Sequence, residues 1–272
     1  MKNLRVLTYH EVDNPANFGQ QLRWLKKNYT IIGIDALEEL QRQNSDLSGC
    51  VLITFDDGER TVFEQGLPIL KTLSIPATVF IVTDYIGTKK PFWWQKVNYY
   101  FKGQPIQERQ NFTKQYKNAT VEQRETLMNR LEHESHLPIF EYNQLTLAEL
   151  KQMHDNGVTI ANHTVNHHFL NELGYEAQCK EMTEARDFLN QHGFYGDYLA
   201  YPNGFYNELT AKALKDSKIK YSFLFDHKIN KEAKDFNISR LSVNSNTALW
   251  KFKFILSGWH SKILKFRLLL KR

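Results

Sequence analysis

The sequence contains little cysteine, which excludes a fold held together by disulfides. Cys50 and Cys179 are the only thiols in 272 residues, and neither belongs to a CxxC pair. Domains built on disulfides are short and carry several cysteines in a regular framework. We therefore expect two reduced, buried thiols in a cytosolic protein, with a single bridge between them as the alternative.

The sequence also lacks long apolar runs, and we expect no secretory leader from its opening residues. No segment approaches the stretch of about eighteen apolar residues that marks a membrane-spanning helix. The opening, "MKNLRVLTYHEV", has a short apolar stretch that is interrupted by Arg5 and alternates as a strand does. From these absences we expect a cytoplasmic protein. Low-complexity segments and repeats are missing too, and 42% hydrophobic residues provide for a folded core.

Acidic residues are missing from one end of the chain. Residues 248–272 contain no Asp or Glu but seven basic residues, which are Lys251, Lys253, Lys262, Lys265, Arg267, Lys271 and Arg272. Removing these seven charges from the net charge of +5 leaves −2 for residues 1–247, so the basicity belongs to the tail.

The tail mixes these charges with aromatic and aliphatic side chains, in "LWKFKFILSGWHSKILKFRLLLKR". This composition favours a basic amphipathic segment in peripheral contact with the anionic inner face of the cytoplasmic membrane. The alternative is a last helix packed on the domain with a solvated basic face. Nucleic acid is not an expected partner, because residues 1–247 carry no basic stripe and no recognition motif.

Short β-like segments alternate with amphipathic stretches along the chain. The expected strands lie at 3–10, 50–55, 77–82, 157–161, 197–201, 219–225 and 238–243, with helical stretches such as 60–73, 146–156, 174–192 and 205–217 between them. This alternation predicts parallel pairing and an α/β fold. Seven strands favour an irregular (β/α)7-type barrel over an open wound sheet.

The alternation stops between residues 88 and 145. "KKPFWWQKVNYYF" is aromatic and basic, and "ATVEQRETLMNRLEHESHL" consists of strong helix formers. We expect a helical insertion on a loop of a domain that spans residues 1–247. Because such loops surround the active site of a barrel, the insertion either shapes a substrate groove or packs as a lid.

Chemically reactive side chains follow several of the expected strands. His10 comes after the first, Asp56 and Asp57 end "VLITFDDG", His163 follows the fourth, and Pro202 follows the fifth. Because the carboxyl ends of parallel barrel strands share one face, we expect these residues to meet there.

Two histidines in "NHTVNHH" (162–168) have the spacing of metal ligands. His163 and His167 stand at i and i+4, which on a helical turn places both imidazoles on one face, whereas His168 would point elsewhere. Together with a carboxylate from Asp56 or Asp57 they form a divalent-metal set with an open position. One Asp would bind the metal, and the other would take the proton of a metal-bound water.

Each half of this set also has an ordinary explanation. A lone HxxxH spacing is often incidental, and one aspartate could cap a helix that starts near Glu59. A cap accounts for one carboxylate and not for two, which favours the metal site.

Three segments together resemble a known family. "TFDDG" (54–58), "HTVNH" (163–167) and "AYPNG" (200–204), with "GLPILKTLSIPATVFIV" (66–82) between them, resemble the polysaccharide deacetylases, also called carbohydrate esterase family four or the NodB-homology fold. The resemblance covers roughly residues 3–245. It implies hydrolysis of an N-acetyl group on an amino sugar, which releases acetate and leaves a free amine.

The resemblance assigns roles to individual residues. It implies that Asp56 is the general base and that Asp57, His163 and His167 bind a divalent metal, usually zinc. Cobalt, nickel or iron would also suit two imidazoles and a carboxylate. In the third motif, the amide of Tyr201 is the expected donor to the oxyanion.

Two features distinguish this chain within the family pattern. The arginine that usually opens the third motif and steadies the catalytic Asp is replaced by Ala200, and Arg240 in "ISRLSV" is the candidate to substitute for it, or else forms a surface ion pair. "LTYHEV" is similar to the branch that deacetylates poly-N-acetylglucosamine, which implies that His10 protonates the leaving amine. The alternative for His10 is a hydrogen-bonded place in the barrel floor.

The resemblance and the basic tail suggest a substrate. We expect an N-acetylated glycan of a surface polysaccharide, or its lipid-linked amino-sugar precursor, at the inner face of the membrane. Two alternatives stay open: an O-acetyl esterase with the same metal site, and a non-catalytic, membrane-associated glycan-binding protein.

Overall fold

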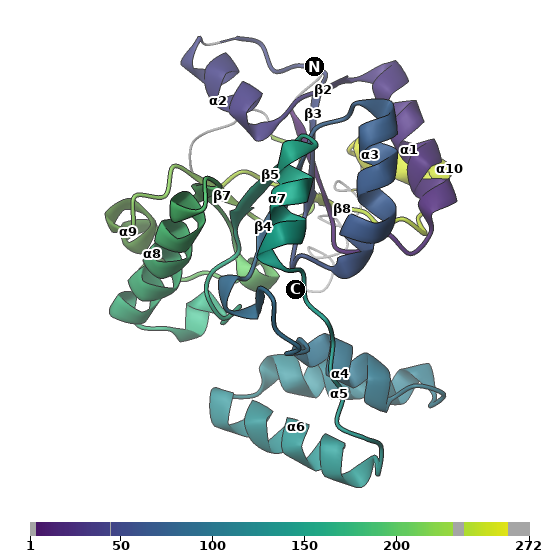
Figure 1. Ribbon diagram of the computed structural model, residues 1–272, viewed down its shortest axis with the longest axis vertical. Helices are drawn as coiled ribbons and strands as arrows, with labels where there is room; N and C mark the ends of the chain where they lie inside the picture. Colours follow the sequence, from purple (N-terminus) through teal and green to yellow (C-terminus); the bar gives the residue numbers. More distant parts are fainter. Residues whose placement is uncertain (1–3, 44, 231–236, 261–272) are drawn as a thin grey trace. The chain divides into compact units, whose positions relative to one another are not determined.

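A computed structural model describes residues 4–43, 45–230 and 237–260, and these form two compact units. The first consists of the described parts of Met1–Ile86 and Leu145–Arg272, and the second of Gly87–Gln144 (Figure 1). The second unit falls in the range for which the sequence predicts a helical insertion. Its role as groove wall or lid stays a prediction.

The first unit is built on a parallel sheet. Its strands are β1 (Arg5–Tyr9), β2 (Thr30–Ile31), β3 (Cys50–Phe55), β4 (Ala77–Ile81), β5 (Val158–Asn162), β6 (Tyr195–Ala200), β7 (Tyr221–Phe223) and β8 (Leu241–Ser242). Their order is β7-β6-β5-β4-β3-β1-β8, with the short β2 beside β3, and all of these pairs are parallel. Apart from β2, each strand lies within or close to a segment that the sequence predicts.

Residues 238–242 bring the two ends of the sheet together. Ile238 donates from its N–H to Ser222 O of β7 and accepts from Leu224 N, both at 2.8 Å. A few residues later, Leu241 of β8 pairs with Leu7 of β1. The strand path therefore meets itself along this segment, which confirms the predicted irregular barrel.

Successive residues of each strand face the barrel interior and the surrounding helices in turn, because side chains in a strand alternate between its two faces. In β3, Val51, Ile53 and Phe55 belong to the core between sheet and helices. Leu52 instead packs with interior residues of the other strands, among them Phe80 of β4. The same alternation continues beyond the strand and directs the next residue, at position 56, to the interior.

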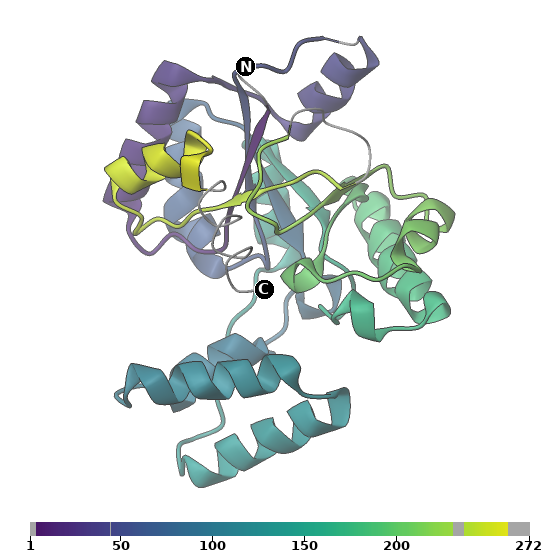
Figure 2. The same ribbon diagram turned by 180° about the vertical axis from the view of Figure 1, so that it is seen from behind.

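The helices of the first unit are α1 (Pro15–Asn28), α2 (Ile34–Arg42), α3 (Leu67–Leu73), α7 (Leu147–Asp155), α8 (Tyr175–Gln191), α9 (Thr210–Asp216) and α10 (Leu249–Leu256). Helices α1, α3 and α10 form one neighbouring group, and α8 packs with α9 (Figures 1 and 2). Helix α7 begins with a capping box, in which Glu149 N donates to Thr146 Oγ1 at 3.2 Å and Thr146 N donates to Glu149 Oε2 at 2.7 Å.

Helix α10 starts the segment for which the sequence favours membrane contact. Phe252 and Leu256 are fully buried in the core beside α1, and Arg5 Nε donates to Leu256 O at 2.6 Å. Trp250 is 73% exposed. Residues 249–256 thus match the packed-helix alternative, while residues 261–272 lie outside the described residues, so membrane contact stays a prediction. None of the described helices combines the length and apolar content needed to span a bilayer.

The second unit contains α4 (Trp93–Tyr100), α5 (Ile106–Asn118) and α6 (Val121–Glu134). Stacked aromatic rings join α4 to its neighbours: Trp93 lies on Tyr116 of α5 with centroids 4.5 Å apart, and Tyr99 lies on Phe140, in the segment after α6, at 4.6 Å. Such offset pairs bury large apolar surfaces in a small unit.

Both cysteines carry free thiols, as the sequence predicts. Cys50, the first residue of β3, is buried, but Cys179 is only half-buried on α8. The expectation that both are buried is therefore wrong for Cys179.

The contact between β6 and α8 requires a glycine at position 196. A Cβ atom there would lie 2.3 Å from Arg186 O and 2.6 Å from Arg186 Cα, both in the backbone of α8. We expect Gly196→Ala to lower the free energy of unfolding by about 3 kcal/mol in urea titrations, because helix and strand must move apart.

Gly19→Ala is the matched control. Its Cβ would meet only the flexible end of Arg23, at 3.3 Å, and alanine stabilises a helix interior by about 0.5–1 kcal/mol relative to glycine. Equal stability of the two variants would contradict the close approach at Gly196.

Candidate metal centre

A left-handed turn follows β3 and separates the directions of two adjacent aspartates. Asp57 and Gly58 have φ values of 69° and 74°, and Gly58 N donates to Asp56 O at 2.8 Å. Asp tolerates this conformation better than most residues, and glycine adopts it freely. A Cβ at Gly58 would lie 2.5 Å from Ile81 Cδ1, so a larger residue would also have to displace the end of that side chain.

His163 and His167 lie on a loop after β5 and not on a helical turn. Thr164 and His167 have φ values of 70° and 60°, which an α-helix does not allow. The expectation of a helical turn is therefore wrong, although the loop does bring the two imidazole rings together, with centroids 4.9 Å apart.

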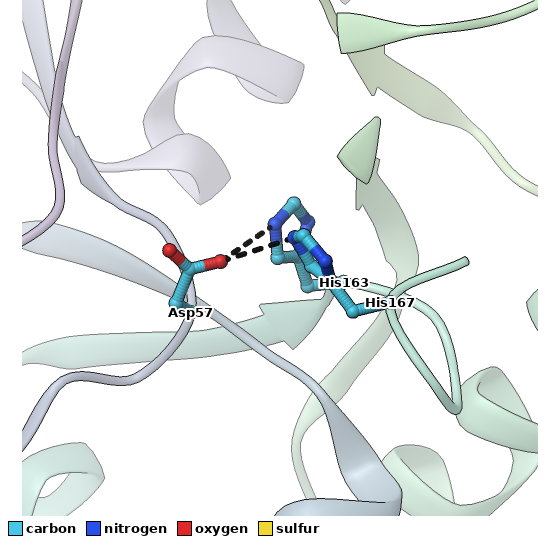
Figure 3. A group of neighbouring side chains, drawn as sticks. All are labelled: Asp57, His163 and His167. Atoms are coloured by element: carbon cyan, nitrogen blue, oxygen red, sulfur yellow. Dashed lines mark ion pairs between the residues drawn. The ribbon is translucent and has the colours of Figure 1, made fainter. Parts of the chain in front are cut away.

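Asp57, His163 and His167 converge on one point (Figure 3). The Nε2 atoms of His163 and His167 lie 3.2 and 3.3 Å from Asp57 Oδ1, and all three side chains are buried. His163 Nδ1 lies 2.9 Å from Ala200 O. Donation from Nδ1 to this carbonyl leaves the Nε2 lone pair free to bind a cation.

This group fits a divalent metal. Asp57 Oδ1 is buried and makes no well-directed hydrogen bond, although both Nε2 atoms lie close to it. Two ligand atoms, each about 2.1 Å from zinc in a tetrahedral site, stand about 3.4 Å apart. The observed separations of Asp57 Oδ1 from the two nitrogens are close to that value, and three protein ligands leave a fourth position open.

Asp56 faces the barrel interior and is bound by Arg240 through two hydrogen bonds. Arg240 Nη1 and Nη2 donate to Asp56 Oδ1 and Oδ2 at 2.6 and 2.7 Å. Arg240 is 0% exposed, and its Nε donates to Leu224 O at 2.8 Å. A bidentate pair of this kind is strong and fixes the carboxylate plane.

Both aspartates are charged in spite of their burial. Burial raises the pKa of the Asp56 carboxyl, but the charge of Arg240 outweighs it and holds the pKa below its usual value. Burial likewise raises the pKa of Asp57, and the adjacent rings of His163 and His167 bring it far below its usual range. Each carboxylate thus has its own stabilising neighbours, a guanidinium for Asp56 and two imidazoles for Asp57, and neither needs a helix cap to explain it.

Comparison with known proteins identifies the family. The family model described as polysaccharide deacetylase matches residues 43–222, more than half of the chain. The chain belongs to the polysaccharide deacetylase family. Over 254 residues it is 22% identical to the poly-beta-1,6-N-acetyl-D-glucosamine N-deacetylase of Staphylococcus epidermidis, covering 89% of this chain and 70% of the relative.

A second relative is longer than this chain. The chain is 26% identical over 220 residues to YxkH from Bacillus subtilis, which covers 77% of this chain but 60% of YxkH. The chain thus spans about three fifths of the length of that relative.

Two solved structures share the fold. The deacetylase PplD of Streptococcus pyogenes, in complex with acetate, has a TM-score of 0.67 at 20% identity and covers 93% of this chain and 98% of its own. IcaB from Ammonifex degensii also has a TM-score of 0.67, at 18% identity, and covers 94% and 98%. At these identities the likeness shows the fold alone.

The family pattern differs at position 200, and the structure shows how the difference is accommodated. Ala200 is buried in the barrel interior, where an arginine is usual in polysaccharide deacetylases, and its carbonyl accepts from His163. The guanidinium that meets Asp56 comes instead from Arg240, whose Cζ lies 5.5 Å from the centre of the Phe80 ring. Arg240 is therefore a buried partner of Asp56 and not a surface ion pair.

His10 lies directly after β1, at the same edge of the sheet. Its partly exposed ring packs edge-on against Phe225, with centroids 5.8 Å apart. His10 also interacts electrostatically with the carboxylates of Asp56 and Asp57. The structure thus brings it to the candidate centre.

Tyr201 does not have the free amide that its expected role requires. Its N–H donates to Phe223 O at 3.2 Å, which extends the pairing of β6 with β7 by one residue. The amide is engaged in the sheet, and this contact argues against Tyr201 as the oxyanion donor.

Two polar residues that hold the histidine loop were not foreseen from the sequence. Asn162 Oδ1 accepts from Thr164 N at 2.8 Å, and Glu181 of α8 accepts from the amides of Val165 and Asn166. Asn before a His-Thr pair is a recognisable turn signal. Glu181 has no such signal, because its contact depends on how α8 packs.

Loss of Arg240 leaves a buried carboxylate without its partner. We expect Arg240→Met to lower the free energy of unfolding by about 3–5 kcal/mol in urea titrations. The double variant Asp56→Asn/Arg240→Met should lose less than the sum of the single losses, because both changes remove the same pair.

The control for this prediction is Arg42→Met, which breaks an exposed ion pair with Glu39. Its cost should stay within about 0.5 kcal/mol. If Arg240→Met were as mild as Arg42→Met, the buried pair would not contribute as the geometry indicates.

Proposed function

We propose that this protein is a metal-dependent N-deacetylase that hydrolyses the N-acetyl group of an amino sugar in a surface polysaccharide. The observation that carries the proposal is the buried Asp57–His163–His167 group beside an ionised Asp56. The name of the Staphylococcus epidermidis relative supports an N-acetylglucosamine polymer as the substrate class.

In this proposal Asp57 Oδ1, His163 Nε2 and His167 Nε2 hold a divalent cation, for which zinc is our first choice. A divalent ion there supplies Lewis acidity, which lowers the pKa of water and polarises the acetyl carbonyl. The chain's part is to present three buried ligand atoms with the right protonation. The hydrogen bond from His163 Nδ1 to Ala200 O serves this purpose.

Asp56 is the proposed general base. Arg240 keeps it ionised and fixes its plane, so a carboxylate stands ready to take the proton of the attacking water. The water oxygen forms a bond to the acetyl carbon, and the carbon–nitrogen bond breaks.

His10 is the proposed general acid, because it stands at the same edge of the sheet and can give the leaving nitrogen its proton. The products are acetate and a free amine, and all atoms of the water appear in them.

The lipid-linked precursor and the inner face of the membrane remain part of the proposal. They are supported by the composition of residues 248–272, with seven basic residues and no acid. An assay with both kinds of substrate separates the polymer from the lipid-linked form.

Acetate release tests the proposed function. We expect the protein to release acetate from N-acetylglucosamine oligomers or from a lipid-linked N-acetylated amino sugar, and chelator treatment to abolish the release until zinc is restored. Asp56→Asn should lower kcat by about 10²–10⁴-fold, because it removes the proton acceptor.

The control is Asp155→Asn, an exposed carboxylate at the carboxyl end of α7, which leads into the opposite end of β5. It should keep the parental rate. Specific glycan binding without acetate release from any substrate, and unaffected by Asp56→Asn, would replace the enzyme with a glycan-binding protein.

His10→Ala distinguishes amide from ester hydrolysis. An amine needs a proton to leave, whereas 4-nitrophenolate does not, so kcat on the N-acetyl substrate should fall by about 10²–10⁴-fold. Hydrolysis of 4-nitrophenyl acetate by the same variant should change little. Equal losses on both substrates would contradict the acid role of His10, and release of acetate from O-acetylated sugars alone would favour the esterase.

A further inference from the structure

Every backbone amide from His163 to His167 has a partner, and side chains supply most of them. His163 N donates to Ile81 O at 2.9 Å, Thr164 N to Asn162 Oδ1 at 2.8 Å, and His167 N to Thr164 Oγ1 at 3.1 Å. The remaining two amides, at 165 and 166, point at the carboxylate of one residue on α8. The loop that carries two of the three candidate ligands is thus held by its own side chains, by the end of β4 and by one neighbouring helix.

That residue is Glu181. Its Oε2 accepts from Val165 N at 3.0 Å and from Asn166 N at 2.9 Å. Its Oε1 accepts from Asn166 Nδ2 at 2.9 Å and lies 3.0 Å from His168 Nδ1. Glu181 is 6% exposed, so its carboxylate is largely removed from water, and four contacts to one short loop replace its hydration.

Glu181 is ionised at neutral pH. Burial raises the pKa of its carboxyl, but the hydrogen bonds with His168 and Asn166 lower it to about 2. An ionised carboxylate only accepts hydrogen bonds, which suits a site made of donors.

The loop needs such support because its backbone is unusual. Thr164 and His167 both have positive φ, which residues other than glycine rarely adopt and β-branched residues avoid. Conformations of this kind persist where surrounding contacts determine them. From the other side, Thr83 N and Asp84 N donate to Thr164 O and Val165 O at 3.1 and 3.0 Å.

We propose that Glu181 is a positioning residue for the metal centre, which holds the loop so that His167 faces Asp57. The proposal rests on the proposed function, because it takes Asp57, His163 and His167 as the ligands. His163 follows β5 directly and is fixed by Ile81 and Ala200. His167 lies between Asn166 and His168, both of which contact Glu181, so its place depends on these contacts.

Zinc affinity, measured by competition with a chromogenic chelator, tests this without any activity assay. Glu181→Met keeps the size of the side chain and removes both acceptors, and we expect zinc to bind about 10–100-fold more weakly. Glu181→Gln removes the charge but keeps one oxygen that can accept from both amides, so its affinity should stay within about threefold of the parent. Recovery in Glu181→Gln separates positioning from charge.

Glu184→Met is the matched control, because Glu184 lies on the same helix, is exposed and faces Lys180 at 3.9 Å. It should bind zinc as the parent does. Parental affinity in Glu181→Met would overturn the proposal, and so would equal weakening in Glu181→Met and Glu181→Gln. A parent that binds no divalent metal would overturn the proposed function itself, which distinguishes the two failures.

A second measurement does not depend on the variants folding. In the metal-free parent, hydrogen exchange at the amides of Val165 and Asn166 should be slowed to the level of β5, because Glu181 already binds them. Exchange at the rate of an unprotected loop would overturn the role of Glu181.

Discussion

The burial of two adjacent carboxylates is the constraint on which the site depends. Asp56 and Asp57 are 3% and 6% exposed, and an ionised carboxylate is stable at such a position only where charged or polar partners replace its hydration. The left-handed turn at Asp57 and Gly58 sends the two side chains to different partners. Asp56 is bound by the guanidinium of Arg240, and Asp57 faces the two imidazoles on the loop after β5.

The same constraint ties the chemistry of the site to the closure of the barrel. Arg240 stands between Ile238, which pairs with β7, and Leu241, which pairs with β1. The segment that joins the two ends of the sheet thus also carries Arg240, whose guanidinium binds Asp56. A change that separates residues 238–242 from β1 or β7 would remove the charge partner of Asp56. A change at Asp56 would leave the guanidinium of Arg240 buried without its carboxylate.

Most of the fold and the core of the site could be predicted from local patterns. Strand positions follow from short β-branched and aromatic runs, and His10, Asp56 and His163 follow from the rule that functional residues stand at carboxyl ends of strands. Arg240 could also be placed, because residues 238 and 240 alternate with the outward-facing Leu241 and Val243. The two-residue alternation of a strand and the order of the motifs along the chain can both be read from the sequence alone.

What could not be predicted depends on packing between distant segments. The spacing of His163 and His167 suits a helix equally well, and only contacts from Asn162, Glu181 and the backbone after β4 select the left-handed loop. The amide of Tyr201, the residue after β6, donates to Phe223 O of β7, because the pairing of the two strands continues one residue past the end of β6. The contacts of Glu181 and of the Tyr201 amide leave no local trace in the sequence, whereas Asn162 is a local turn signal.

Position 200 shows why a site can keep its chemistry while a motif residue changes. Inside a barrel, a basic side chain can pair with a buried carboxylate from any segment that places an interior-facing residue at the same height along the barrel axis. Ala200 and Arg240 are both buried there: Ala200 packs in the same cluster as Phe80, and the guanidinium of Arg240 lies over the Phe80 ring. The carbonyl of Ala200 still orients His163, because that contact belongs to the backbone and does not depend on the side chain. The charge beside Asp56 is therefore a requirement of the barrel interior, and the strand that supplies it is free to differ.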